Sequence, residues 1–428
     1  MPLSDERLER LEQETFTYFW KETNPENGLL PDNTLIDGPA SIAGVGLALS
    51  AWPVGVERGF VDRAHALQRA LATLRFFWNS VQSTDADATG HHGFYYHFLD
   101  VKTGRRAWKC ELSTIDTAIL IAGALAAAAC FDRDSRDERE LRELAGQLYE
   151  RIDWRWAQNG GLTVSHGWTP ERGFLPYRWE GYCEAILLYA LGLGSPTFPL
   201  PEESYERWAA TYRWKTLYGQ QFLYGGPLFM HQLSHMWIDF RGIQDAFMRD
   251  KGIDYFENSR RATYVQQAYA MRNPKRFDEY GQYAWGITAS NGPGPATRRL
   301  DGVTRRFLGY RARGVPYGPD DGTLAPWAVA ASLPFAPEIV LPTLRYSLER
   351  FPKADTRYGL VCSVNPTFRT PRKGGWISSA HFALDQGPVI LMIENYRSGL
   401  IWRLMRRCSP LVTGLRRAGF SGGWLDGA

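Results

Sequence analysis

Two glutamates flank a cysteine at residues 176–185, in the segment PYRWEGYCEA. Helical periodicity over 177–193 predicts that Glu180 and Glu184 lie one turn apart on the same face of a helix. In a partly buried cleft, two like charges raise one carboxyl pKa, and a raised pKa suits a general acid. Glu180 is expected to contact the substrate, with a first-turn acid favoured by the helix dipole as the alternative. That alternative explains Glu184 poorly, because the apolar run AILLY follows it.

A second pair of acids precedes an alanine-rich apolar segment, within CELSTIDT at residues 110–117. Ser113 and Asp116 have the spacing of a capping box, so the role of Asp116 could be limited to the start of a helix. Glu111 precedes that helix and stands near Trp108. For Glu111, which lies outside the helix, the more specific hypothesis is contact with a substrate.

Aromatic residues are abundant, with 16 Trp, 21 Tyr and 22 Phe. Their rings can stack on the C–H faces of sugars while their polar atoms bond hydroxyl groups, although a large aromatic core is the alternative. The rings expected at the rim of a sugar-binding cleft are Trp108, Trp179, Tyr182, Trp237, Trp285, Tyr317 and Trp376. Several stacked rings along one cleft would favour a chain of sugars over a single sugar.

His231, His235 and Asp239 recur at every fourth residue in HQLSHMWID. A helix predicted over 231–249 would place them on one face, where they could ligate zinc. The segment lacks the glutamate of an HExxH motif, so we expect no metal and no other cofactor. We interpret the three residues as a polar wall of the cleft, with capped core histidines as the alternative.

Three aspartates occur late in the chain beside turn-forming residues. Asp320 and Asp321 stand in PYGPDDGT, where Pro and Gly also favour a turn, and both are candidates for substrate contact. Asp385 stands in HFALDQGP before a new apolar segment, so it could be a helix N-cap. Its aromatic neighbourhood keeps it a candidate for chemistry.

Helices are expected to position these residues. Helical periodicity is found at 5–22, 42–51, 61–80, 113–130, 136–156, 177–193, 205–217, 231–249, 255–271, 324–332, 337–351 and 389–404. Short β-pairs are expected only as loop decorations, near 93–97 and 161–166. This pattern predicts an all-α fold, an (α/α)-type toroid of two concentric helix rings, formed by residues 1–428 as one catalytic domain.

Composition excludes several classes of protein. The 428 residues are 44% hydrophobic and 22% charged, and the net charge of +3 comes from mixed charges without the basic stripe of a nucleic-acid-binding protein. No nucleotide-binding glycine motif follows a strand, and no apolar run is long enough to span a membrane. The five cysteines show no CxxC spacing and are expected to be free.

The ends of the sequence carry weaker signals. The first residues have no apolar signal region, so the chain as it stands is expected in the cytoplasm, or in the periplasm if a signal peptide has been removed. A GxSxG match at 419–423 has no room for later triad partners and is expected to be a flexible tail. The arginines of 403–417 are expected to form a solvated face.

Six motifs spread over residues 12–402 are shared with one family: CELSTIDTAIL, WEGYCEAILLYALGLGSP, HQLSHMWIDFRGI, WGITASNGPG, PDDGTLAPWA and DQGPVILMIENYRSGLIW. Together they resemble the bacterial glycoamylase-like family, which includes the endo-β-1,2-glucanases of glycoside hydrolase family 144. The (α/α)6 fold of that family agrees with the helix pattern. The resemblance implies hydrolysis of a β-1,2-linked or related glucan by two carboxylates, without a metal.

Residue roles follow from the motifs. Glu184 would be the acid, and Asp385, Glu111 and Asp116 are candidates for activating water. An inverting enzyme would separate its two carboxyls by about 6.5 to 9.5 Å, against about 5 to 5.5 Å in a retaining one. An inverting hydrolase is the leading hypothesis. Transglycosylation of the same glucans and sugar binding without catalysis are the alternatives, but binding alone would not require a partly buried Glu184.

Overall fold

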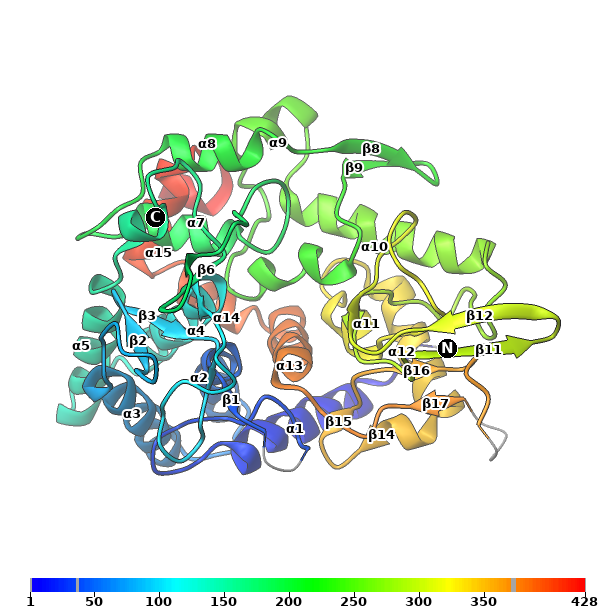
Figure 1. The fold of residues 1–428 in the computed structure, drawn as a ribbon, viewed down its shortest axis with the longest axis horizontal. Coiled ribbons are helices and arrows are strands. Elements are labelled where there is room, and N and C mark those ends of the chain that lie inside the picture. The colour runs from blue at the N-terminus through cyan, green and yellow to red at the C-terminus, as the bar shows by residue number, and fades with distance from the viewer. Residues whose placement is uncertain (1, 36–37, 371–374, 428) are drawn as a thin grey trace.

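Helices dominate the computed structural model, which describes residues 2–35, 38–370 and 375–427 (Figure 1). The first half contains α1 (Asp5–Glu22), α2 (Ile42–Glu57), α3 (Arg63–Asn79), α4 (Thr114–Cys130), α5 (Arg136–Glu150), α6 (Trp154–Ala157), α7 (Ile186–Gly194) and α8 (Glu203–Ala209). The second half contains α9 (Ala246–Lys251), α10 (Tyr255–Arg272), α11 (Pro326–Ala331), α12 (Pro337–Arg350), α13 (Ala383–Arg397), α14 (Leu400–Met405) and α15 (Ser409–Arg417). The helix-rich prediction is confirmed.

The helices are of two kinds. The apolar helices α2, α4, α7, α11 and α13 are buried along almost their whole length. Others, such as α1 and α5, bury one apolar stripe and expose acids and bases on the opposite face, as surface helices do. Side-chain caps begin several of them: Ser4 accepts from the N–H of Arg7 before α1, and Ser135 accepts from the N–H of Glu138 before α5.

The helices α2 and α4 touch backbone to backbone. A methyl group added at Gly123 would lie 1.9 Å from the carbonyl oxygen of Gly46, and one added at Gly46 would lie 2.4 Å from that of Ile119. Only glycine allows so close an approach. Helix α13 packs against α2 and α11, so the central helices form one continuous core.

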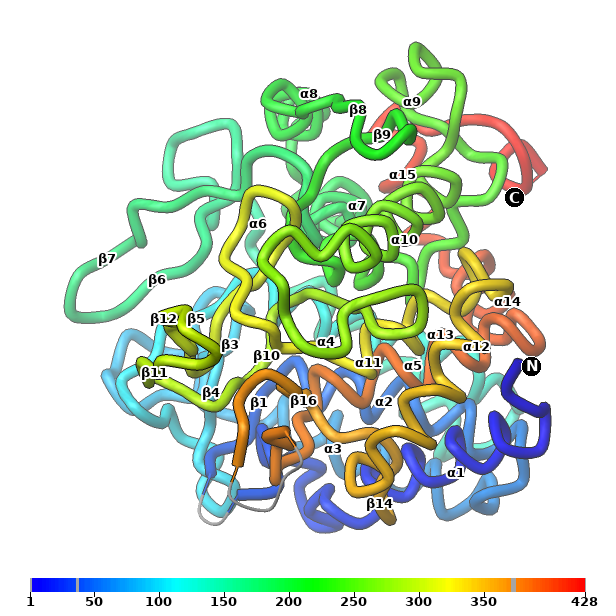
Figure 2. Tube along the Cα trace, turned by 90° about the vertical axis from the view of Figure 1, so that its right-hand side faces the viewer, coloured from blue at the N-terminus to red at the C-terminus, as the bar shows by residue number. Residues whose placement is uncertain are grey.

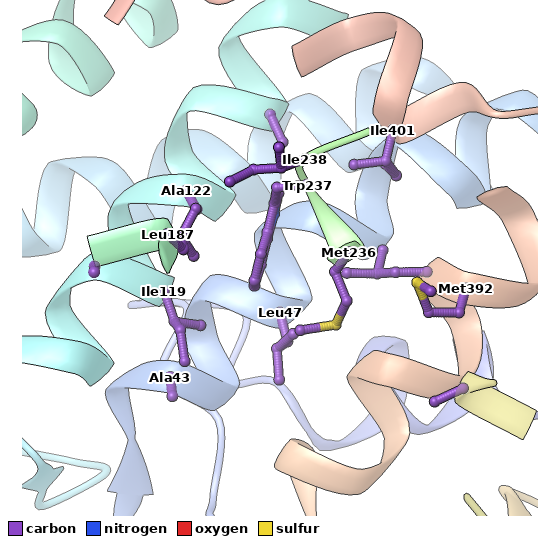
Figure 3. Packing of buried hydrophobic residues seen from close by; sticks show 14 of the residues in the cluster. Ala43, Leu47, Ile119, Ala122, Leu187, Met236, Trp237, Ile238, Met392 and Ile401 are labelled. Carbon is purple, nitrogen blue, oxygen red and sulfur yellow. The ribbon is translucent and has the colours of Figure 1, made fainter. Parts of the chain in front are cut away.

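Large apolar side chains from distant segments fill that core. Figure 3 shows Trp237 enclosed among residues of α2, α4, α7 and α14, including Ala122 and Leu187. The indole of Trp237 is fully buried, and its N–H donates to the hydroxyl of Ser50 in α2 at 2.9 Å. The chain around 237 is therefore anchored at the centre of the molecule.

The strands are short, and most of them gather on one side of the molecule (Figure 2). An antiparallel sheet has the order β2 (Gly90–His91), β3 (Phe94–Tyr96), β5 (Leu112–Ser113), β6 (Gly167–Thr169) and β7 (Gly173–Phe174). Pairs are formed by β1 (Ala40–Ser41) with β4 (Phe98–Leu99), β8 (Trp214–Leu217) with β9 (Gln220–Leu223), and β10 (Ala289–Ser290) with β13 (Arg311–Ala312). Further pairs join β11 (Ala296–Leu300) with β12 (Val303–Phe307), β14 (Asp355–Thr356) with β15 (Gly359–Leu360), and β16 (Val364–Asn365) with β17 (Trp376–Ile377).

The predicted β-pair near 93–97 is confirmed by β3, whereas the second begins beyond 161–166, at β6. Three predicted helices are shorter than expected. Residues 177–185 are irregular before α7, and 210–217 leave the helix and enter β8. Residues 231–249 form two 3₁₀ turns, η1 (Leu228–His231) and η2 (Leu233–Met236), followed by α9. Further 3₁₀ turns are η3 (Pro352–Ala354) and η4 (Gly423–Gly427).

The C-terminal segment is ordered, so the expectation of a flexible tail is wrong. Ser421 forms a β-bridge with Gln244, and Phe420 and Leu425 are buried. The expected solvated face is largely confirmed: of the arginines of 403–417 only Arg406 is half-buried, and the exposed Arg417 also donates to the carbonyl of Leu193. Within the described residues, no helix has both the length and the apolar character needed to cross a membrane.

The close contact of α2 with α4 yields a stability test. We expect Gly123→Ala to lower the free energy of unfolding by about 1 to 3 kcal/mol, because the new methyl group must push two backbones apart. Urea unfolding followed by circular dichroism measures this. The control is Gly146→Ala in α5, where an added methyl meets nothing within 4 Å in the described structure and should stabilise the helix. Equal stability of the two variants would contradict the packing argument.

Candidate functional site

Two adjoining cavities share Tyr310, Leu384 and Asp385. The acid cavity, of about 150 Å³, is lined by Ile115, Asp116, Ile119, Glu184, Phe229, Leu233, Ala289, Tyr310, Trp327, Leu384 and Asp385. The side cavity, of about 370 Å³, is lined by Asp32, Asn33, Leu35, His97, Phe98, Asn291, Tyr310, Cys362, Phe382, Leu384 and Asp385. Three of the predicted catalytic acids thus face one small, largely apolar space.

The starts of buried helices bring these acids together. Asp116 lies in the first turn of α4, Asp385 in the first turn of α13, and Glu184 two residues before α7. Helix N-termini carry partial positive charge, which favours acidic side chains there. Acids far apart in the sequence therefore meet because the N-terminal ends of these helices face the same cavity.

Glu184 is partly buried at the cavity wall. Its Oε2 is shielded from water, and no donor in the described part of the chain bonds it. Burial raises the pKa of Glu184 to about 7. Because residues 180–184 are not helical, the prediction that Glu180 and Glu184 share a helix face is wrong: burial accounts for the raised pKa, and Glu180 is exposed and accepts from Thr163.

Asp385 is more deeply buried than Glu184. Its Oδ2 also has no hydrogen-bond partner among the described residues, and burial raises its pKa to about 8. The nearby Asp32 raises the pKa further, whereas a contact with the Cys362 thiol acts to lower it. The N-cap alternative is wrong, because α13 begins at Ala383 and Asp385 is already inside its first turn.

The N-cap half of the predicted capping box at the start of α4 is confirmed. The N–H of Asp116 donates to Oγ of Ser113 at 3.2 Å, and that hydroxyl lies 2.5 Å from Oδ2 of Asp116. The same carboxylate lines the acid cavity. Asp116 can therefore both contribute to the start of the helix and take part in chemistry in the cavity.

Glu111 lies behind this group and does not line the acid cavity. Its Oε1 is 2.8 Å from Nδ1 of His97. Burial alone would raise the pKa of Glu111, but the hydrogen bond and the charge of His97 lower it below its usual value. Glu111 is thus placed to stabilise a neighbour, and its assignment as a water-activating residue is not supported by its position.

The histidine wall is not part of either cavity. His231 and His235 are fully buried and contact Tyr182 and Ser259, and burial lowers their pKa values to about 4 and about 3. Asp239 is buried in an ion-pair network with Arg241 and Arg406. The core alternative is therefore correct, because an extended helical face does not form here.

Several predicted sugar-stacking rings also belong to the core. Tyr182, Trp237 and Trp285 are buried, and the indole of Trp285 donates to Thr343 at 2.9 Å. None of the three lines either cavity, so the structure places these rings in the core and does not support their predicted contact with a ligand. The many aromatic residues are in large part core residues, and the argument for a long row of stacked sugars loses these rings.

The late aspartates other than Asp385 are structural. Asp320 accepts from the hydroxyls of Tyr269 and Tyr280, at 2.8 and 2.7 Å. Asp321 is buried and forms an ion pair with Arg313 at 2.7 Å. Both carboxylates hold the loop that precedes α11, in place of the predicted contact with a substrate.

Five predicted substrate-binding residues remain accessible. Trp108 is exposed near Phe98 of the side cavity, with ring centroids 5.1 Å apart. Trp179 stacks on His166 at 3.8 Å. The remaining three are the exposed Glu180 and Tyr317 and the partly buried Trp376. Their contact with a ligand stays a prediction.

The sequence interpretation missed other cavity residues, namely Asp32, His97, Asn291, Tyr310 and Cys362. Tyr310 lies beside the acids but is 69% exposed, so its hydroxyl can reach a ligand. The sequence offered two signals for these residues: the turn sequence around Asp32, and the position of His97 directly after an aromatic strand.

The geometry favours acid–base chemistry. Two buried carboxyls with raised pKa values hold a proton near neutral pH, and a third carboxylate, Asp116, lies on the same wall beside hydrogen-bond donors. In an apolar space such groups can give a proton to a bound molecule and take one from water. Among the described residues, no group of His, Cys, Asp and Glu has the arrangement of a metal site.

Comparison with protein families identifies the glycoamylase family. The glycoamylase family model, described as "Putative glucoamylase", matches residues 176–409. That range includes Glu184 and Asp385, while Asp32, His97 and Asp116 precede it.

Known proteins similar to this chain act on β-1,2-glucans. The exo β-1,2-glucooligosaccharide sophorohydrolase of Parabacteroides distasonis is 26% identical over 452 residues, covering 97% of this chain and 58% of that protein. The chain therefore spans less than two thirds of that relative. The endo-β-1,2-glucanase of Chitinophaga pinensis, solved with sophorotriose and glucose, has a TM-score of 0.86 at 26% identity, covering 98% of this chain and 99% of that one.

A further solved structure has a higher sequence identity to this chain. A protein from Bacteroides uniformis, described as a "putative glucoamylase", is 32% identical with a TM-score of 0.86, and 99% of each chain is covered. The structural match thus includes the segments before residue 176 that supply Asp32, His97 and Asp116.

The burial of Asp239 gives a test of its structural role. We expect Asp239→Asn to lower the free energy of unfolding by about 1 to 3 kcal/mol, because Arg241 and Arg406 lose their charged acceptor. Urea unfolding measures the change. The exposed Asp250→Asn, which removes only a surface pair with Lys251, is the control and should leave stability unchanged. Unaltered stability of Asp239→Asn would contradict the assignment.

Proposed function

Because this chain belongs to the glycoamylase family, we propose that it hydrolyses β-1,2-linked or closely related glucans. The observation that carries the proposal is the acid cavity, where Glu184 and Asp385 face one small space and each has one carboxyl oxygen with no hydrogen-bond partner among the described residues. The named activities of the relatives from Parabacteroides distasonis and Chitinophaga pinensis support this substrate class.

We assign the general acid to Glu184. With a pKa of about 7, it is near half-protonated at neutral pH, which suits a group that gives and regains a proton in each turnover. Its proton would pass to the glycosidic oxygen as the bond to the anomeric carbon breaks. The leaving sugar then departs as a neutral alcohol.

The second task is activation of water, and we assign it to Asp116. The Ser113 hydroxyl and the imidazole of His97 can donate to this carboxylate, and both interactions stabilise its negative charge. It would take a proton from the water that attacks the anomeric carbon from the opposite face, which inverts the configuration. Asp385, with a pKa of about 8, keeps its proton at neutral pH and can donate to a sugar oxygen.

We also propose that the central helices form the inner ring of an (α/α)6 toroid and that residues 1–428 act as one catalytic domain. The burial of α2, α4, α7, α11 and α13 on nearly all sides supports an inner ring, while the amphipathic α1 and α5 suit an outer one. The proposed substrate is an oligo- or polysaccharide bound at the strand-rich side.

Replacing Glu184 tests the proposal. We expect Glu184→Gln to lower kcat on β-1,2-glucooligosaccharides by at least about 100-fold, because the amide cannot donate the proton. Proton NMR of fresh reaction mixtures measures the rate and shows which anomer forms first, expected to be the α-anomer for the wild type. The wild-type kcat should fall as pH rises through about 7, where Glu184 loses its proton.

The matched control is Glu143→Gln, an exposed glutamate on α5, which should keep wild-type activity. Maltooligosaccharides assayed in parallel test whether α-linked glucans are cleaved instead. Wild-type turnover in Glu184→Gln would remove this residue from the mechanism. Cleavage of α-linked substrates alone would overturn the proposed substrate class.

A further inference from the structure

His97 forms part of the wall of the side cavity, between β3 and β4. Its N–H donates to the carbonyl of Glu111 at 2.9 Å, and its carbonyl accepts from the N–H of Ile42 at 3.2 Å. The ring stacks on Phe98, with centroids 3.9 Å apart and planes at 12°. The imidazole is therefore held in one orientation by its main chain and by a neighbouring ring.

Both ring nitrogens of His97 face acids. Nδ1 lies 2.8 Å from Oε1 of Glu111, and Nε2 lies 3.6 Å from Oδ2 of Asp116. A neutral imidazole has one N–H, whereas an imidazolium has two and can donate in both directions. The geometry therefore fits a positively charged ring between two carboxylates from different parts of the chain.

The wider surroundings of the ring are acidic. Burial acts to lower the pKa of His97, but Asp116, Glu111 and Asp32 together outweigh it and raise the pKa to about 9. These acids come from the start of α4, the segment before β5 and the loop before β1. Arg106, Cys110 and His166 are further charged or titratable groups that interact with Glu111.

We propose that His97 is a positioning residue for the hydrolysis, an imidazolium that is fixed by Glu111 and holds the carboxylate of Asp116 toward the acid cavity. This inference rests on the proposed function for its effect on turnover. It assigns Glu111 the task of orienting and charging His97, and it explains why Glu111 is near the site but outside the acid cavity. Neither residue would need to touch the substrate.

Two substitutions separate the hydrogen bond of the ring to Glu111 from its ion pair with Asp116. The amide nitrogen of Gln can replace Nε2, so His97→Gln keeps a donor for Asp116, whereas the shorter Asn replaces Nδ1 and keeps a donor only for Glu111. We expect kcat to fall about 10-fold in His97→Gln and about 100-fold in His97→Asn, with KM within about 3-fold of the wild type, because misplacement of a reacting group lowers the rate. His65→Gln on the exposed face of α3 is the control and should be fully active.

A titration that needs no glucan tests the charge directly. Proton–nitrogen NMR of histidine-labelled protein should show His97 titrating near pH 9, and Glu111→Gln should shift this titration downward. The ion pairs should stabilise the fold fully below about pH 6.5 and lose this effect as pH rises through about 9, so the Tm difference between wild type and His97→Gln should shrink over that range.

The outcomes distinguish the positioning role of His97 from the proposed hydrolysis of glucans. Titration of His97 below pH 7, or a His97→Asn variant as active as His97→Gln, would overturn the positioning role. If no glucan is cleaved but His97 still titrates near 9 and responds to Glu111→Gln, the proposed function fails while the charged bridge to Glu111 and Asp116 is supported.

Discussion

The site requires that carboxyl groups be kept away from water. Glu184 and Asp385 each keep one oxygen buried without a donor among the described residues, an arrangement that costs free energy unless the group holds a proton. Burial raises both pKa values toward or above neutrality. A fold that maintains this strain must be rigid around the cavity, since any opening would admit water and restore the ordinary pKa.

The helices that begin at the cavity supply this rigidity. Helix α4 approaches α2 so closely that Gly46 and Gly123 allow no side chain between them, and α13 packs against the same core. The first turns of α4 and α13 then carry Asp116 and Asp385 to fixed positions. Packing energy far from the cavity thus offsets the cost of holding acids in an apolar space.

The acids of the site differ in charge state for a physical reason. Glu184 and Asp385 are buried and tend to hold protons. Beside them, His97 brings a positive charge between Glu111 and Asp116, and this lowers the pKa of Glu111. The same apolar surroundings therefore keep a proton donor and an ionised carboxylate close together, which a solvent-exposed pair of acids could not do.

Features that depend on local spacing could be predicted from the sequence. It predicted the helix-rich fold and the cap of Ser113 on Asp116, and it singled out Glu184 and Asp385, which line one cavity, because periodicity, caps and motifs are properties of neighbouring residues. Tertiary structure alone decided which residues are buried. It placed His231 in the core and brought His97 between two acids, because burial and charge depend on contacts between segments that are distant along the chain.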